Sequence, residues 1–146
     1  MADGLFAERY SRNFDTLSLE EQDKLGSATV AVIGLGGLGG TVLEMLARVG
    51  VGTLILVDGD VFDETNLNRQ LLSRETLIGV SKARTAGDRV AAINSEVEVH
   101  VFETYVDETN LHDYIKDADL VMDCLDSIDI RFALQEAADK AGIPIV

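Results

Sequence analysis

The 146-residue sequence contains one cysteine, one proline and no tryptophan. A single cysteine, Cys124, supports neither an internal disulfide framework nor a cysteine zinc site within these residues. No run of 18 or more apolar residues is present, so the sequence predicts no membrane span. The N-terminal stretch MADGLFAERYSRNF lacks the basic and then apolar segments of a secretory signal, and we therefore expect a cytoplasmic protein.

Basic residues are also scarce, because 12 Lys and Arg stand against 26 Asp and Glu, a formal net charge of −14. Such a surface repels the phosphates of nucleic acids, so a large RNA or DNA partner is not expected. What is present is typical of a soluble globular protein: 47% of the residues are apolar and 26% are charged. The length is that of one domain with a sizeable core.

The residue pattern predicts an N-terminal arm and short helix over residues 1–26, followed by a nucleotide-binding domain over residues 27–146. Ser18 and Glu21 have the spacing of a capping box, and Gly26 suits the end of that helix. Apolar, β-branched segments then alternate with amphipathic ones. We expect strands over 28–34, 53–59, 97–103 and 118–124, and helices over 37–49, 81–94, 107–117 and 129–142.

This alternation predicts an α/β fold, a Rossmann-like parallel sheet with helices on both faces. The last residues, 143–146, have the pattern of another strand that has just begun. We therefore expect the nucleotide-binding domain to be truncated at its C-terminal end.

A glycine-rich turn follows the first expected strand. Gly34, Gly36 and Gly39 satisfy the spacing G-x-G-x-x-G between a strand and a helix. In such a turn the first glycine permits the tight bend, the second lets the backbone approach a phosphate, and the third lets the helix pack closely. Asp58 lies 19 residues beyond Gly39, at the end of the second strand, where a carboxylate can accept hydrogen bonds from ribose hydroxyls.

The glycines alone do not distinguish NAD from ATP, but the polar residues that follow Asp58 favour ATP. Asn66, Asn68 and Arg69 lie in the loop after the second strand, and Lys82 begins a helix. An arginine fork and a lysine point charge suit phosphate oxygens. Asp126 follows the fourth strand at the same edge and is an expected Mg²⁺ ligand, although its position also suits a helix N-cap. Hydride transfer needs no such cation and metal set, whereas transfer at phosphorus does.

At these residues the chain resembles the ThiF/MoeB/HesA family, bacterial relatives of ubiquitin-activating enzymes. The resemblance rests on RYSRNF, GLGGLGG, VDGDVFDETNLNRQ, GVSKA and DCLDSIDIR, and runs from about Arg9 to Val146. It implies an enzyme that uses Mg-ATP to adenylylate the C-terminal glycine carboxylate of a ubiquitin-like sulfur-carrier protein ending in Gly-Gly. It also implies a homodimer in which Arg12 reaches the phosphates bound by the other subunit.

The catalytic residues that we expect are Arg12, Arg69, Lys82 and Asp126. The residues that we expect at the nucleotide are Gly34, Gly36, Gly37, Gly39, Asp58, Asp60, Thr65, Asn66, Asn68, Arg69, Lys82, Asp126 and Ser127.

The sequence departs from the family pattern at two points. Many members carry paired Cys-x-x-Cys zinc motifs and a reactive cysteine, which Cys124 alone cannot supply. Ser127 stands where the family often has Asn. His100 and His112 lie away from every motif, and we expect structural roles for both. Two alternatives remain open: an NAD-binding domain of a dehydrogenase, and a family relative that acts on a small molecule or a modified tRNA base.

Overall fold

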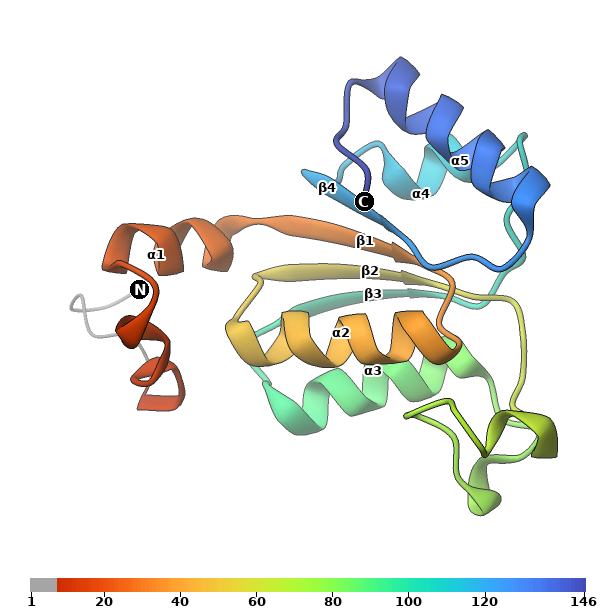
Figure 1. The fold of residues 1–146 in the computed structure, drawn as a ribbon, viewed down its shortest axis with the longest axis horizontal. Coiled ribbons are helices and arrows are strands. Elements are labelled where there is room, and N and C mark those ends of the chain that lie inside the picture. The colour runs from red at the N-terminus through yellow and green to blue at the C-terminus, as the bar shows by residue number, and fades with distance from the viewer. Residues whose placement is uncertain (1–7) are drawn as a thin grey trace.

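Four parallel strands form the centre of the structure, a computed structural model that describes residues 8–146 (Figure 1). The strands are β1 (Thr29–Ile33), β2 (Thr53–Val57), β3 (Glu98–Phe102) and β4 (Leu120–Asp123). Their order in the sheet is β3-β2-β1-β4, so β2 and β3 lie on one side of β1 and β4 lies on the other. The reversal creates a switch point between β1 and β4, the place where ligands bind in open α/β sheets.

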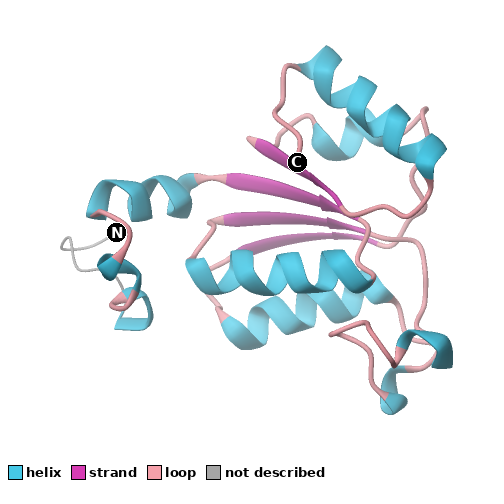
Figure 2. Cartoon of the chain, viewed as in Figure 1, coloured by secondary structure: helices cyan, strands magenta, loops and turns pink. Residues whose placement is uncertain are grey.

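Two pairs of helices cover the two faces of this sheet (Figure 2). Helices α2 (Gly37–Val49) and α3 (Lys82–Ile93) pack on one face, and α4 (Leu111–Ile115) and α5 (Ile128–Ala141) pack on the other. Side chains alternate between faces along a strand, so Val32 of β1 joins the first core whereas Ala31 and Ile33 join the second. Strands β1 and β2 are buried on both faces and read as continuous apolar runs, and this pattern predicted the Rossmann-like fold correctly.

The N-terminal arm packs at the amino ends of the strands. It contains two short 3₁₀ helices, Glu8–Tyr10 and Asn13–Asp15, and leads into α1 (Leu19–Ser27). The predicted capping box at the start of α1 is confirmed, because the Ser18 hydroxyl accepts from the Glu21 backbone and the Glu21 carboxylate accepts from Ser18. The first seven residues of the predicted arm lie outside the described residues.

Three local predictions differ from the structure. Gly26 does not end α1, because the helix continues to Ser27 and passes through an extended Ala28 into β1. The predicted helix over 107–117 forms only at Leu111–Ile115. Asp107 instead accepts hydrogen bonds from the backbone and hydroxyl of Thr109, a local turn that competes with helix formation. The last predicted strand is reduced to one bridge between Val121 and Ile145.

Further short elements lie in the crossover between β2 and α3. Two more 3₁₀ helices, Glu64–Asn66 and Glu75–Leu77, shape that connection. Across residues 8–146, no helix combines the length and apolar character needed to cross a membrane.

Candidate functional site

A pocket of about 450 Å³ opens at the carboxyl ends of the strands, beside the switch point between β1 and β4. It collects residues from six separate segments of the chain. The predicted site residues that line it are Gly34, Gly36, Gly37, Asp58, Asp60, Arg69, Lys82, Asp126 and Ser127. Gly39, Thr65, Asn66 and Asn68 lie outside the lining, and their contact with a nucleotide stays a prediction.

The glycine turn after β1 has the strained geometry that only glycine allows. Gly34 adopts φ +93°, and a Cβ there would lie 2.6 Å from the carbonyl oxygen of Cys124. A Cβ on Gly39 would lie 1.8 Å from the Gly34 carbonyl oxygen. Gly39 therefore serves the close packing of α2 against the turn, which keeps the backbone of Gly36 and Gly37 at the pocket wall.

Three helices begin at this pocket. Helix α2 starts at Gly37, α3 starts at Lys82, and α5 starts one residue after Ser127. The first N–H groups of a helix have no partner within the helix, and the helix dipole places partial positive charge there. The arrangement therefore favours an anion such as a phosphate.

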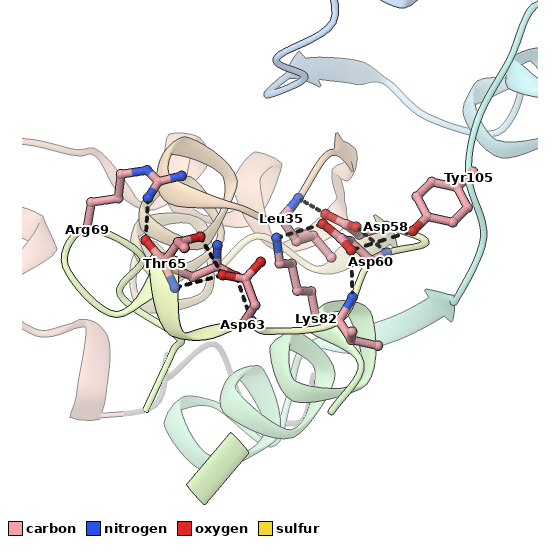
Figure 3. A network of polar contacts seen from close by, with 10 residues as sticks. Leu35, Asp58, Asp60, Asp63, Thr65, Arg69, Lys82 and Tyr105 are labelled. Atoms are coloured by element: carbon pink, nitrogen blue, oxygen red, sulfur yellow. Dashed lines mark hydrogen bonds and ion pairs between the residues drawn. The ribbon is translucent and has the colours of Figure 1, made fainter. Parts of the chain in front are cut away.

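Asp58 fixes the glycine turn as well as facing the pocket. Its Oδ2 accepts a hydrogen bond of 2.7 Å from the Leu35 backbone N–H, and its Oδ1 accepts one of 2.8 Å from Asp60 (Figure 3). Each carboxylate oxygen has two lone pairs, so both retain capacity for a further donor such as a ribose hydroxyl. The side chain thus connects the shape of the turn to ligand binding.

Lys82 is a buried cation held by a partly exposed acid. The residue is only 5% exposed, and its Nζ lies 3.1 Å from Oδ2 of Asp60. The ammonium also lies 5.9 Å from the centre of the Phe62 ring. A buried charge needs such a partner, because leaving water is costly for an unpaired ion. A phosphate entering the pocket would be a second anionic partner for this lysine.

Arg69 is oriented by its own loop. Its Nη1 donates to the Thr65 carbonyl oxygen at 2.7 Å (Figure 3). It also donates to Asn68 Oδ1 at 3.0 Å. Buried Asn66 accepts from the Asp63 backbone at 3.0 Å and so holds the turn that carries the loop. In this structure Thr65, Asn66 and Asn68 position the guanidinium rather than line the pocket.

Asp126 and Ser127 face the pocket between β4 and α5. The N-cap of α5 is Ser127 rather than Asp126, and the Ser127 side chain makes no capping hydrogen bond. The alternative interpretation of Asp126 as a helix cap is therefore not supported. Within residues 8–146 there is no cluster of three or more His, Cys, Asp or Glu side chains that could hold a metal ion.

Arg12 lies far from this pocket. It sits between the two 3₁₀ helices of the arm, and Asn13 next to it donates to the carbonyl of Val49 at the far end of α2. Helix α2 begins at the pocket and is 13 residues long, which separates its ends by about 20 Å. Arg12 therefore does not line the pocket of its own chain.

The sequence analysis missed several lining residues. Gln70 is 7% exposed and lines the pocket, and its Oε1 has no hydrogen-bond partner among residues 8–146. Its place directly after Arg69 in the NLNRQ motif was the available signal. Tyr105 also lines the pocket and belongs to the loop after β3, which no motif marked.

Cys124 is a further lining residue. Burial, with a smaller effect of the Asp123 charge, raises the pKa of its thiol to about 11. A protonated thiol is a poor nucleophile.

Comparison with known proteins gives consistent matches. The model of the ThiF family matches residues 10–146. The SAMP-activating enzyme E1 of Haloferax volcanii is 38% identical over 141 residues, 95% of this chain and 52% of that protein. The probable adenylyltransferase/sulfurtransferase MoeZ of Mycobacterium tuberculosis is 41% identical over 140 residues, 94% of this chain and 36% of that protein. The chain thus spans about half or less of these relatives.

A solved structure agrees with the sequence matches. It is the crystal structure of the E. coli tRNA N6-threonylcarbamoyladenosine dehydratase TcdA in complex with ATP. The TM-score is 0.91 at 29% sequence identity, over 94% of this chain and 57% of that one.

Proposed function

The chain belongs to the ThiF family, and from that premise we propose that it binds Mg-ATP and adenylylates the C-terminal carboxylate of a small ubiquitin-like carrier protein. The observation that carries the proposal is the composition of one pocket. It joins a phosphate-binding glycine turn and Asp58 to Arg69, Lys82 and Asp126. A hydride-transfer site would need the first two features but not the cations.

Each part of ATP has a matching group in the pocket. The backbone of Gly36 and Gly37 and the start of α2 suit phosphate oxygens, and the carboxylate of Asp58 suits the ribose hydroxyls. The ATP complex of TcdA, a relative in fold and sequence, supports a nucleotide of this kind. Gly34 and Gly39 act through the shape of the turn.

The proposed reaction suits residues that supply charge rather than a base. A carboxylate oxygen of the carrier forms a bond to the α-phosphorus of ATP, and the bond to the pyrophosphate oxygen breaks. The products are an acyl-adenylate and pyrophosphate. A C-terminal carboxyl has a pKa of about 3.5, so it is already ionised at neutral pH and needs no general base. Arg69 and Lys82 would offset the repulsion between the anionic nucleophile and the anionic phosphates.

Magnesium fits the same pocket through Asp126. Mg²⁺ is commonly held by one or two carboxylates together with substrate phosphates, so a single acid at the pocket wall suffices without a larger cluster. When bound, the ion would supply further positive charge to the phosphates. Asp126 is exposed, and the Ser127 hydroxyl makes no capping hydrogen bond. Both side chains would hold the phosphate end of the nucleotide.

Two acceptors are supported by the relatives of this chain. The SAMP-activating enzyme E1 and MoeZ are named for activation and adenylyl transfer, which supports adenylylation of a protein carrier. That the carrier ends in Gly-Gly is what the family resemblance implies. TcdA is named as a tRNA-modifying enzyme, which supports the modified base as the second candidate. The net charge of −14 favours the carrier, because an acidic surface repels tRNA.

We further propose a homodimer, because Arg12 is exposed and lies at the opposite end of α2 from its own pocket. In a dimer Arg12 could reach the phosphates of the other copy. Sedimentation should show a dimer, and Arg12→Ala should slow adenylylation without changing that dimer. A monomer at the concentration used in the assay would contradict a site shared between two copies.

The experiment for the proposed reaction is ATP–pyrophosphate exchange, measured with labelled pyrophosphate and a carrier that ends in Gly-Gly. Exchange that requires the intact Gly-Gly end is the expected result. A carrier truncated by two residues is the matched control. Exchange that is equal with both carriers would contradict recognition of the Gly-Gly end, because the truncated carrier still ends in a carboxylate.

A further inference from the structure

Tyr105 places an aromatic ring at the pocket wall, on the loop that follows β3. The residue is 71% exposed, so its ring contributes little to the core. The other two tyrosines have structural contacts. Tyr10 is buried and accepts a hydrogen bond of 2.7 Å from Asn94, and the Tyr114 ring lies 5.0 Å from that of Phe102. Among the three, Tyr105 alone is directed to the pocket.

The main chain, rather than the hydroxyl, fixes the position of this ring. A Cβ on Gly59 would lie 2.5 Å from the Tyr105 nitrogen and 2.6 Å from its Cγ, so the loop packs directly on the residue after Asp58. Asn110 Nδ2 donates to the Tyr105 carbonyl at 3.1 Å. The hydroxyl lies 3.5 Å from Asp60 Oδ1, longer than a normal hydroxyl hydrogen bond (Figure 3).

The order of the strands indicates which part of a nucleotide meets Tyr105. The glycine turn follows β1, Asp58 follows β2, and Tyr105 follows β3, and these strands are neighbours in that order. A nucleotide with phosphates at the turn and ribose at Asp58 would extend its base toward the loop after β3. The same part of the pocket is lined by the apolar residue Val106.

We propose that Tyr105 is a nucleotide-binding residue whose ring stacks on the base. The proposal rests on the ATP function proposed above and adds the residue that holds the base. Aromatic side chains stack on any base, because every base has a π face. Tyr105 would therefore raise the affinity for a nucleotide that has a base without selecting one base over another.

The test compares two ligands on the same variants, Mg-ATP and inorganic tripolyphosphate with Mg²⁺. Tripolyphosphate lacks the base and the ribose. Tyr105→Ala should weaken ATP binding by about tenfold, the scale of losing one stacked aromatic, and should leave tripolyphosphate binding unchanged. Tyr105→Phe keeps the ring and should rescue ATP binding. Phe132→Ala is the matched control, because Phe132 is 66% exposed on α5 and lines a different pocket.

A second readout follows from the absence of tryptophan, because tyrosine then provides the intrinsic emission. ATP should quench this emission in the parent chain, and the quenching should be largely lost in Tyr105→Phe. ATP affinity of Tyr105→Ala within twofold of the parent would overturn the role of Tyr105 while leaving the ATP site intact. An equal loss of both ligands, or a Tyr105→Phe variant as weak as Tyr105→Ala, would overturn stacking. A parent chain that binds neither ligand would overturn the proposed function and this inference together.

Discussion

The two ends of the parallel sheet differ in how completely their buried side-chain amides are paired. At the amino end, Tyr10, Asn13, Gln22 and Asn94 form a set that we call the amino-end cluster. Asn94 is 2% exposed and donates to Tyr10 at 2.7 Å and to the Ala47 carbonyl at 3.0 Å. Gln22 is 1% exposed, donates to the Val49 carbonyl at 2.8 Å and accepts from Asn13 at 2.8 Å. These side-chain amides are paired within the fold.

At the carboxyl end, the pocket leaves hydrogen-bonding capacity unused. Buried Gln70 has an Oε1 atom with no partner among residues 8–146. The hydroxyl of Ser127, an exposed residue, makes no capping hydrogen bond. Buried polar groups normally find partners, so unmet capacity beside a pocket indicates ligand binding. The buried amides of the amino-end cluster thus serve the fold. Of the two unpaired buried side-chain atoms in residues 8–146, Gln70 Oε1 and Thr85 Oγ1, it is Gln70 that lines the candidate pocket.

The largest expected effect is on the chemical step at the pocket. Asp126→Asn and Arg69→Ala should each slow ATP–pyrophosphate exchange by on the order of 10²-fold or more, the scale of losing one charge-stabilising group. ATP affinity should fall much less, because Asp58 and the glycine turn still hold the nucleotide. Asp126→Asn keeps the shape and removes the charge. Exchange at the parental rate in that variant would show that the Asp126 charge has no role.

The next effect is on ATP binding through Asp58. Asp58→Ala removes the acceptor of the Leu35 backbone N–H and of the expected ribose hydroxyls. The loss should be on the order of 1.5–3 kcal/mol of binding free energy, measured by titration calorimetry. Asp23→Ala, an exposed acid on α1 at the amino end, is the control for one lost charge. Affinity within twofold of the parent for Asp58→Ala would place the ribose elsewhere.

The amino-end cluster should respond in stability rather than in binding. Asn94→Ala leaves the Tyr10 hydroxyl and the Ala47 carbonyl without their buried donor. We expect unfolding to become easier by about 1–3 kcal/mol, seen as a fall in Tm of roughly 3–10 °C. ATP affinity of the folded variant should match that of the parent. A large loss of ATP affinity with an unchanged Tm would contradict a structural role for the amino-end cluster and would indicate a role in ATP binding.

The last prediction concerns the stability of the fold in acid, through an ion pair that belongs neither to the pocket nor to the amino-end cluster. Glu44 on α2 bridges Arg89 of α3 and Arg48, and the hydrogen bonds from Arg89 first, then Arg48, lower its pKa from 4.5 to about 2 against the effect of burial. When folding lowers the pKa of a carboxyl group, the ionised group stabilises the fold. This contribution is complete at pH values above the pKa of the same group in the unfolded chain. That contribution should fade as pH falls from about 4.5 to about 2.

Urea unfolding of the parent and Glu44→Gln at several pH values measures this contribution. The difference in unfolding free energy between them should be constant near neutral pH and should shrink across the acid window. A difference that is independent of pH down to 2 would mean that the bridge contributes no charge-dependent stability.

The sequence predicted the parts of the molecule that depend on local pattern. The glycine spacing, the apolar strands and the Ser18–Glu21 cap each depend on residues that are close in the chain, and each was confirmed in the structure. The loop after β3 could not be predicted in this way. Tyr105 reaches the pocket because the loop packs on Gly59, a contact between residues 46 positions apart.

The site residues of the DETNLNRQ loop, residues 63–70, illustrate the same limit. The sequence motif gathers Thr65, Asn66, Asn68 and Arg69 together, but it does not say which of them face a ligand. The structure places Arg69 at the pocket and assigns hydrogen bonds within the loop to the other three. Orientation of this kind depends on how the crossover folds back on the sheet.

We propose that the carboxyl-end pocket binds ATP and not a redox dinucleotide. Titration calorimetry of the 146-residue chain with ATP and with NAD, each in the presence of Mg²⁺, tests it most directly. We expect saturable binding of Mg-ATP and no measurable binding of NAD. NAD binding that equals or exceeds that of Mg-ATP would contradict it.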